Sequence, residues 1–184
     1  MNLGVFMFNS TRKIIPALAL LSLLTVSPTA FANDQAKLAL AKKVVFEATE
    51  ISPYADPQFK KILQKAHQIN QREAKTRGDV GCEFYESPYL GGGTDAPIIT
   101  NWKAGVTKSG MVRATFNNTA GNISGHLIEF DMTCRGSSCV VNDVRIANNW
   151  DSATPPQRTK YSLRKDAQAI VSANGCGNYQ GANF

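Results

Sequence analysis

The sequence predicts one α+β domain in residues 33–184, built from two helices, a four-stranded antiparallel meander and a closing helix. Three observations predict it. Apolar residues recur at spacings of three and four before residue 78, they alternate in four runs between residues 98 and 146, and helical spacing returns after residue 162. Helices gathered on one side of an antiparallel sheet define the α+β class.

Residues 1–32 have the pattern of a cleavable export signal. Arg12 and Lys13 precede an apolar run over 14–26, and Ala30 and Ala32 supply the small residues before the cleavage point. The run is shorter than the roughly 20 residues that a membrane span needs. Cleavage after Ala32 would leave 152 residues, the length of one domain, in the periplasm or secreted, with no transmembrane segment. The alternative is an uncleaved membrane anchor.

Two helices are expected next. The first covers about 35–50 and is ended by Ser52-Pro53-Tyr54. The second begins at Asp56-Pro57, where an acidic cap precedes a proline in the first turn, and ends at Gly78. The expected buried stripes are Leu38, Ala41, Val45 and Ala48 in the first helix and Phe59, Ile62, Leu63, Ala66 and Ile69 in the second.

The segment 79–97 is predicted to be a long loop containing Cys82, Phe84, Tyr85 and Tyr89. Large aromatic side chains are mostly buried, so we expect them to cover the core. Because loops of this length are often functional, an exposed binding surface at Tyr85 and Tyr89 is the alternative.

Four alternating runs predict the strands, and residues near Ser162 open the last helix. Trp102 is expected on the inward face of the first strand, and His126 on the inward face of the third. The inward sets are Ile98, Thr100, Trp102, Ala104 and Val106, then Val112, Ala114 and Phe116, then His126, Ile128, Phe130 and Met132, and finally Val140, Val144 and Ile146.

Four cysteines in an exported chain predict two disulfides. Cys134 and Cys139 flank a turn-forming tetrapeptide between two strands, so they should face each other across a hairpin. The remaining pair, Cys82 with Cys176, would close a long loop. A metal site is the competing idea, but the chain has no C-x-x-C and neither histidine is near a cysteine. We expect no metal and no cofactor.

The net charge of +6 falls to +4 when Arg12 and Lys13 leave with the signal. The basic excess is densest along the second helix, where we expect a solvated face; attraction to anionic lipid, a cell-wall polymer or an acidic protein is the alternative. Nucleic acid is not expected as a partner because no aromatic residues are interleaved with the charges. These basic residues are Lys60, Lys61, Lys65, Arg72, Lys75 and Arg77.

Several short motifs resemble a bacterial family of exported proteins and lipoproteins of unknown function. They are Ile51-Ser52-Pro53-Tyr54, Phe84-Tyr85, Val141-Asn142-Asp143-Val144-Arg145-Ile146 and Ser162-Leu163-Arg164. The resemblance implies the cone-shaped nuclear transport factor two-like fold. That fold is used by enzymes, small-ligand carriers and protein-binding modules, so it does not identify the function. This chain departs from the family pattern at Cys139, where a tryptophan is usual.

Few residues point to catalysis. His67 is expected to be a solvated helix residue, whereas His126 is expected to point inward near Trp102, where a structural role is more common than a catalytic one. Asp143 and Arg145 lie two apart on one strand and predict a salt bridge.

We therefore predict a non-catalytic binding protein whose partner is another exported or envelope protein, for example a toxin that it neutralises. The first alternative is a carrier that holds a small ligand or envelope component in a cavity lined by Trp102, Phe116, His126 and Phe130. A hydrolase or isomerase is the second. The candidate binding surface or cavity consists of Tyr85, Tyr89, Trp102, His126, Asp143 and Arg145.

Overall fold

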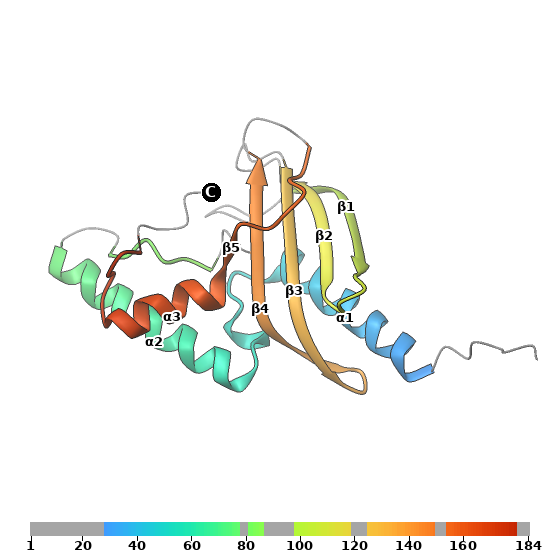
Figure 1. The fold of residues 1–184 in the computed structure, drawn as a ribbon, viewed down its shortest axis with the longest axis horizontal. Coiled ribbons are helices and arrows are strands. Elements are labelled where there is room, and N and C mark those ends of the chain that lie inside the picture. The colour runs from blue at the N-terminus through green and yellow to red at the C-terminus, as the bar shows by residue number, and fades with distance from the viewer. Residues whose placement is uncertain (1–27, 78–80, 87–97, 119–124, 150–153, 180–184) are drawn as a thin grey trace, which may run out of the picture.

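The computed structural model describes residues 28–77, 81–86, 98–118, 125–149 and 154–179. Three α-helices and five strands follow one another along the chain (Figure 1). The elements are α1 (Pro28–Glu47), the short 3-10 helix η1 (Ser52–Tyr54), α2 (Pro57–Arg77), β1 (Ile99–Val106), β2 (Val112–Asn118), β3 (Gly125–Arg135), β4 (Ser138–Asn149), β5 (Tyr161–Ser162) and α3 (Leu163–Ala173).

The strands form one antiparallel sheet in the order β1-β2-β3-β4-β5, which confirms the meander. The predicted number of four strands is wrong, because Tyr161 and Ser162 pair with Ile146 and Arg145 of β4. Ser162 belongs to both elements: it ends β5, and its hydroxyl accepts a hydrogen bond from the Lys165 N–H at the start of α3. Only this capping role is visible in the sequence.

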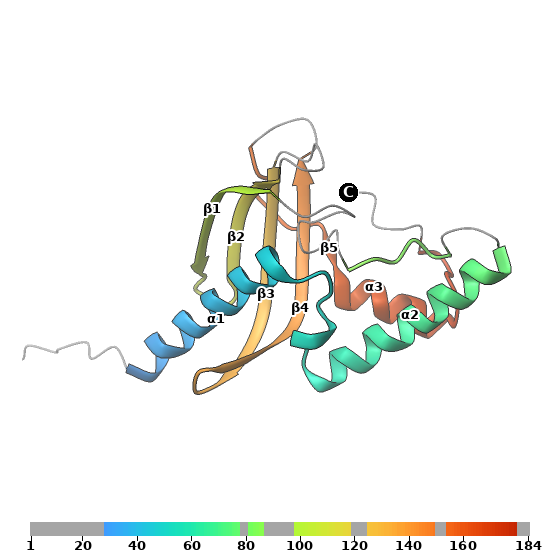
Figure 2. The same ribbon diagram turned by 180° about the vertical axis from the view of Figure 1, so that it is seen from behind.

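The helices form two separate groups against the sheet. In Figures 1 and 2, α1 crosses one face of the sheet, whereas α2 and α3 pack against each other beside its β4 end. Ala41 and Val45 of α1 and Phe59 and Leu63 of α2 are fully buried, so the predicted stripes are confirmed. The sheet is open, so the α+β class is confirmed, while the cone stays a prediction.

The predicted inward face of β1 is wrong in its first half. The pairing of β1 with β2 shifts between Thr100 and Lys103, and Asn101 between them has a φ of 55° in the left-handed region. This bulge reverses the alternation, so that Ile99, not Ile98, packs with Trp102 against the core. Ile98 is 57% exposed.

Both expected disulfides are formed. Cys134 and Cys139 are register partners across the β3–β4 hairpin, and Cys82 is joined to Cys176 beyond α3. The helix α1 begins at Pro28, upstream of the predicted cleavage point after Ala32. The rest of the predicted export signal lies outside the described residues, so its cleavage stays a prediction.

Candidate functional site

The short segment 81–86 presents one exposed aromatic side chain between buried neighbours. Cys82, Phe84 and Glu86 are 1–3% exposed, whereas Tyr85 is 45% exposed. The segment therefore alternates between the core and solvent, and Tyr85 is held on its outer side. The other predicted aromatic of this loop, Tyr89, lies outside the described residues.

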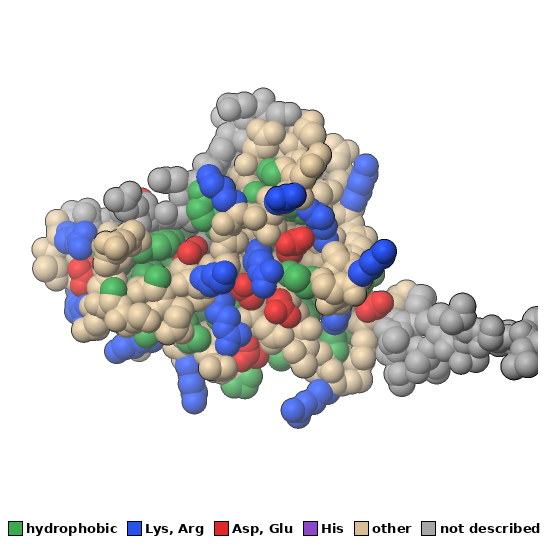
Figure 3. Space-filling model, in the orientation of Figure 1, with side chains coloured by type: hydrophobic (Ala, Val, Ile, Leu, Met, Phe, Trp, Pro, Cys, Tyr) green, Lys and Arg blue, Asp and Glu red, His purple; other side chains and the backbone are tan. Residues whose placement is uncertain are grey.

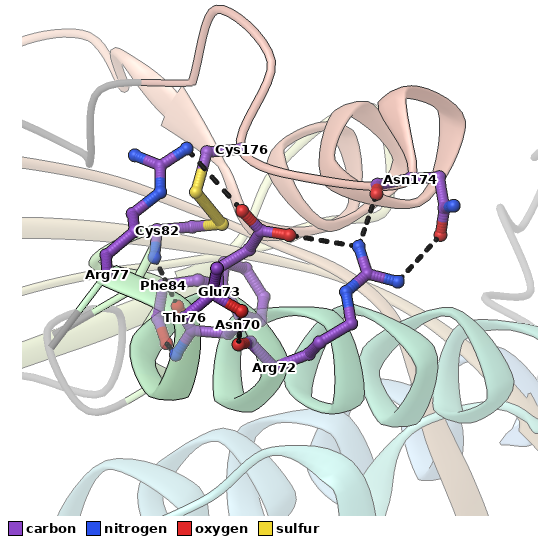
Figure 4. The surroundings of a disulfide bond; sticks show 9 residues. All are labelled: Asn70, Arg72, Glu73, Thr76, Arg77, Cys82, Phe84, Asn174 and Cys176. Atoms are coloured by element: carbon purple, nitrogen blue, oxygen red, sulfur yellow. Dashed lines mark hydrogen bonds and ion pairs between the residues drawn. A yellow bond between two sulfur atoms is a disulfide. The ribbon is translucent and has the colours of Figure 1, made fainter. Parts of the chain in front are cut away.

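The disulfide and α2 hold the first end of this segment (Figure 4). Asn70 of α2 accepts a hydrogen bond from the Cys82 N–H at 2.7 Å, and its amide donates to the Phe84 carbonyl at 3.4 Å. Gly81 has a φ of 72°, and a Cβ at this position would overlap the Asn70 carbonyl oxygen. Only glycine allows the chain to pass this close to α2.

The far side of the disulfide is also tied to α2. The Arg72 guanidinium donates to the carbonyl and the side-chain oxygen of Asn174, just beyond α3 (Figure 4). Glu73 pairs with Arg72 at 3.0 Å and with Arg77 at 3.5 Å. The segment 81–86, α2 and the end of α3 are thus joined by a covalent bond and polar contacts.

A buried carboxylate fixes the second end of the segment. Glu86 accepts hydrogen bonds from the backbone N–H groups of Ile51 and Ser52 and from the Ser52 hydroxyl. His67 Nε2 of α2 lies 2.7 Å from Glu86 Oε1. A buried carboxylate is tolerated only when it is paired and hydrogen-bonded, and these contacts meet that need.

The expectation that His67 is a solvated helix residue is therefore wrong. Its hydrogen bond to Glu86 raises the pKa of the imidazole above its ordinary value, against the lowering effect of burial. The two residues are 19 apart in sequence and one is in a loop, so no helical or strand spacing predicts the pair. Sequence reasoning missed Glu86 altogether.

The predicted cavity residues pack against one another under α1. The His126 ring is stacked on Phe116, with centroids 4.7 Å apart, and Phe116 in turn contacts Trp102 at 5.7 Å. Trp102 also meets Phe46 of α1 edge-on at 5.4 Å. These rings form one continuous aromatic cluster between α1 and β1–β3.

His126 points inward as predicted and is fully buried. Neither ring nitrogen has a hydrogen-bond partner among the described residues. Burial lowers the pKa of His126 to about 4. Asn148, opposite on β4, has a smaller raising effect on this pKa, although its amide lies outside hydrogen-bond geometry. His126 is therefore neutral at pH 7, as befits a ring inside the core.

Asp143 and Arg145 form the expected salt bridge, with 3.2 Å between Arg145 Nε and Asp143 Oδ2. The Asp143 carboxylate also has hydrogen-bond partners outside this salt bridge. It accepts hydrogen bonds from the Ser162 hydroxyl at 2.8 Å and from the Arg164 N–H at 3.0 Å, at the start of α3. Asp143 thus joins β4 to α3, and its oxygens are used in holding the fold together.

A groove of about 500 Å³ lies between the start of α2 and the β3–β4 hairpin. Arg135 and Arg164 line it, and Arg164 donates to Asp56, to Gln58 and to the Asn142 carbonyl. The guanidinium is already occupied by these three acceptors. Among the described residues no cluster of three or more His, Cys, Asp or Glu side chains is placed to hold a metal ion.

The predicted site residues fall into three places. Tyr85 lies on the segment along α2, Trp102 and His126 lie in the ring stack beneath α1, and Asp143 and Arg145 lie where β4 meets α3. The first place combines exposure with a fixed backbone, which makes it the candidate functional site.

No family model, no curated protein and no solved structure matches this chain. The resemblance to an exported bacterial family accordingly stays a prediction. The two disulfides indicate an oxidising compartment. Within the described residues, no helix is both long and apolar enough to cross a membrane.

Proposed function

We propose that this protein is a non-catalytic binding protein that docks onto another exported or envelope protein through the surface around Tyr85. The single observation that carries the proposal is an aromatic side chain, 45% exposed, fixed between the buried anchors Phe84 and Glu86. Tyrosine is enriched among the residues that dominate binding energy at protein interfaces.

The anchors favour binding because they reduce its entropic cost. Association requires loops and side chains at the interface to become ordered. Here the disulfide of Cys82, the contacts of Asn70 and the buried carboxylate of Glu86 order the backbone on both sides of Tyr85 beforehand. The backbone around Tyr85 would therefore lose little conformational entropy when a partner binds.

The carrier alternative receives less support. It requires an open cavity inside a nuclear transport factor two-like cone, whereas the sheet is open and the rings of Trp102, Phe116 and His126 pack on one another. Catalysis at His126 would require a proton-accepting or proton-donating partner, and none of the described residues bonds to its ring nitrogens. A protein such as an exported toxin remains the partner that fits the proposal.

The test is capture of envelope proteins on the immobilised, oxidised protein, followed by mass spectrometry. We expect Tyr85→Ala to reduce the captured partner by about tenfold or more, as hot-spot truncations do. Ile98→Ala is the matched control, because Ile98 is an apolar side chain that is 57% exposed and lies next to β1, on another part of the chain. Since Tyr85 is a surface residue, the free energy of unfolding of the Tyr85→Ala variant should differ from that of wild type by less than about 0.5 kcal/mol.

Equal capture by wild type and Tyr85→Ala would contradict the proposal. So would loss of capture in a folded His126→Ala variant, because that result would move the binding site to the interior beneath α1.

A further inference from the structure

The solvent face of α2 is cationic along its whole length. Every exposed residue of this helix from Gln58 to Arg77 is Lys, Arg, Gln or Thr. Six of the helix's residues are Lys or Arg, and the helix of 21 residues is about 30 Å long. Figure 3 shows Lys and Arg side chains spaced along the margin of the molecule that α2 forms.

The charge of the four lysines of α2 is not paired within the described structure. Glu73, the one acid of α2, faces α3 and pairs with Arg72 and Arg77 at the end of the helix. No described residue forms an ion pair with Lys60, Lys61, Lys65 or Lys75. These four lysines therefore carry positive charge that no described ion pair compensates.

The composition of the face favours a protein over a bilayer as its partner. A helix that lies in a membrane interface inserts an apolar face among the lipids. The apolar residues of α2, among them Phe59, Leu63 and Ile69, are buried in the core, and glutamines separate the exposed lysines. Glutamine and lysine side chains can pair with carboxylates of a facing protein surface.

The cationic face adjoins the segment that presents Tyr85. The segment 81–86 contacts α2 through His67, Asn70 and Ala74. Residues three and four apart are neighbours on a helix, so Gln64 and Gln71 lie beside His67, and Gln71 in turn lies beside Lys75. One partner surface could therefore cover both Tyr85 and the lysines.

We infer that the face of α2 formed by Lys60, Lys61, Lys65 and Lys75 docks an acidic protein surface. The inference rests on the proposed function, because it names the charge of the partner that meets Tyr85. The lysines steer the acidic partner during its approach and fix its orientation along α2, and the Tyr85 segment supplies the apolar contact.

The test uses a poly-glutamate peptide with the oxidised protein, monitored by calorimetry and by amide chemical shifts. At low ionic strength we expect the shifts to concentrate on α2 around Lys61, Lys65 and Lys75. Changing these three residues to Gln should weaken the peptide affinity about tenfold, and physiological salt should reduce it in wild type. Glutamine already alternates with lysine on this face, so the variant keeps its solubility and fold.

The matched control changes Lys103, Lys108 and Arg158 to Gln, which removes the same charge from exposed positions outside α2. The inference would be overturned if both triple variants lost the same peptide affinity, or if the amide shift changes were spread evenly over the α2 lysines and the three control residues. Either result would show that only net charge matters. Preferential binding of phosphatidylglycerol vesicles through the α2 lysines would also overturn it. Tyr85→Ala should leave the peptide affinity unchanged. The peptide test therefore probes the α2 lysines alone, and its failure can be distinguished from failure of the proposed binding through Tyr85.

Discussion

At the scale of single residues, His67 decides how firmly Glu86 is held. Three partners of the carboxylate, two backbone N–H groups and the Ser52 hydroxyl, are uncharged, but the fourth, His67, changes charge with pH. A protonated imidazole adds a charge-assisted contact at 2.7 Å, whereas a neutral one is at best an ordinary hydrogen bond. The pair is thus the part of the Tyr85 anchor that responds to pH.

The expected outcome is a pH-dependent stability difference between wild type and His67→Gln. Because folding raises the pKa of His67, the contribution of its charge is complete below about pH 6.5 and is lost as pH rises through the folded-state value. Denaturant unfolding at several pH values should show that wild type is more stable than His67→Gln below pH 6.5. The difference between their free energies of unfolding should shrink as the pH rises above this value. A constant difference across this range would contradict the assignment.

The contribution of His126 to stability should depend on pH in the opposite direction, because it is lost as the pH falls. Its pKa falls from 6.5 to about 4 on folding, so its stabilising neutral state is favoured above pH 6.5, and stability is lost as pH falls toward 4. The loss amounts to about 3 kcal/mol by pH 4. His126→Phe, which keeps the stacking on Phe116, should remove this acid sensitivity in denaturant unfolding.

A second variant controls for the possibility that the phenyl ring of His126→Phe, which is larger than imidazole, packs poorly. His126→Leu should flatten the acid limb of the same stability curve even if its overall stability is lower. If both variants retain the full wild-type loss on acidification, then His126 is not its source.

At the scale of elements, the two disulfides should contribute unequally. Cys82–Cys176 spans 94 residues, whereas Cys134–Cys139 spans 5 across a hairpin already paired by β3 and β4. The chain-entropy model assigns about 4–5 kcal/mol to the long loop and about 2 kcal/mol to the short one. Replacing Cys82 and Cys176 together by Ser should therefore lower the thermal midpoint more than replacing Cys134 and Cys139. Equal decreases would count against this account.

The elements also show which parts of the fold local patterns can predict. The helix α2 was predicted well, because its apolar stripe and its Asp56-Pro57 start are both visible within a few residues. The two-residue strand β5 was not predicted, because its pairing with β4 is a tertiary contact. The bulge at Asn101 has no sequence signal stronger than an asparagine, which tolerates the left-handed region.

At the scale of the whole molecule, the sequence predicted the helix–meander–helix order and both disulfides, but only part of the candidate site. Exposure of Tyr85 was an alternative rather than the first expectation, because aromatic residues are usually buried. The Glu86 anchor brings η1, α2 and segment 81–86 together through residues that are 34 and 19 apart in sequence, which periodicity does not connect. Such contacts depend on how the elements are packed.

The bond between Cys82 and Cys176 has a consequence for proteolysis. It encloses the whole sheet and α3 in one covalent ring, while α1 and all of α2 lie on the free arm before it. A protease nick inside the ring adds one water but leaves both fragments joined in one molecule until a reductant separates them. A nick before residue 82 leaves the arm held only by noncovalent contacts, so denaturation without a reductant separates it.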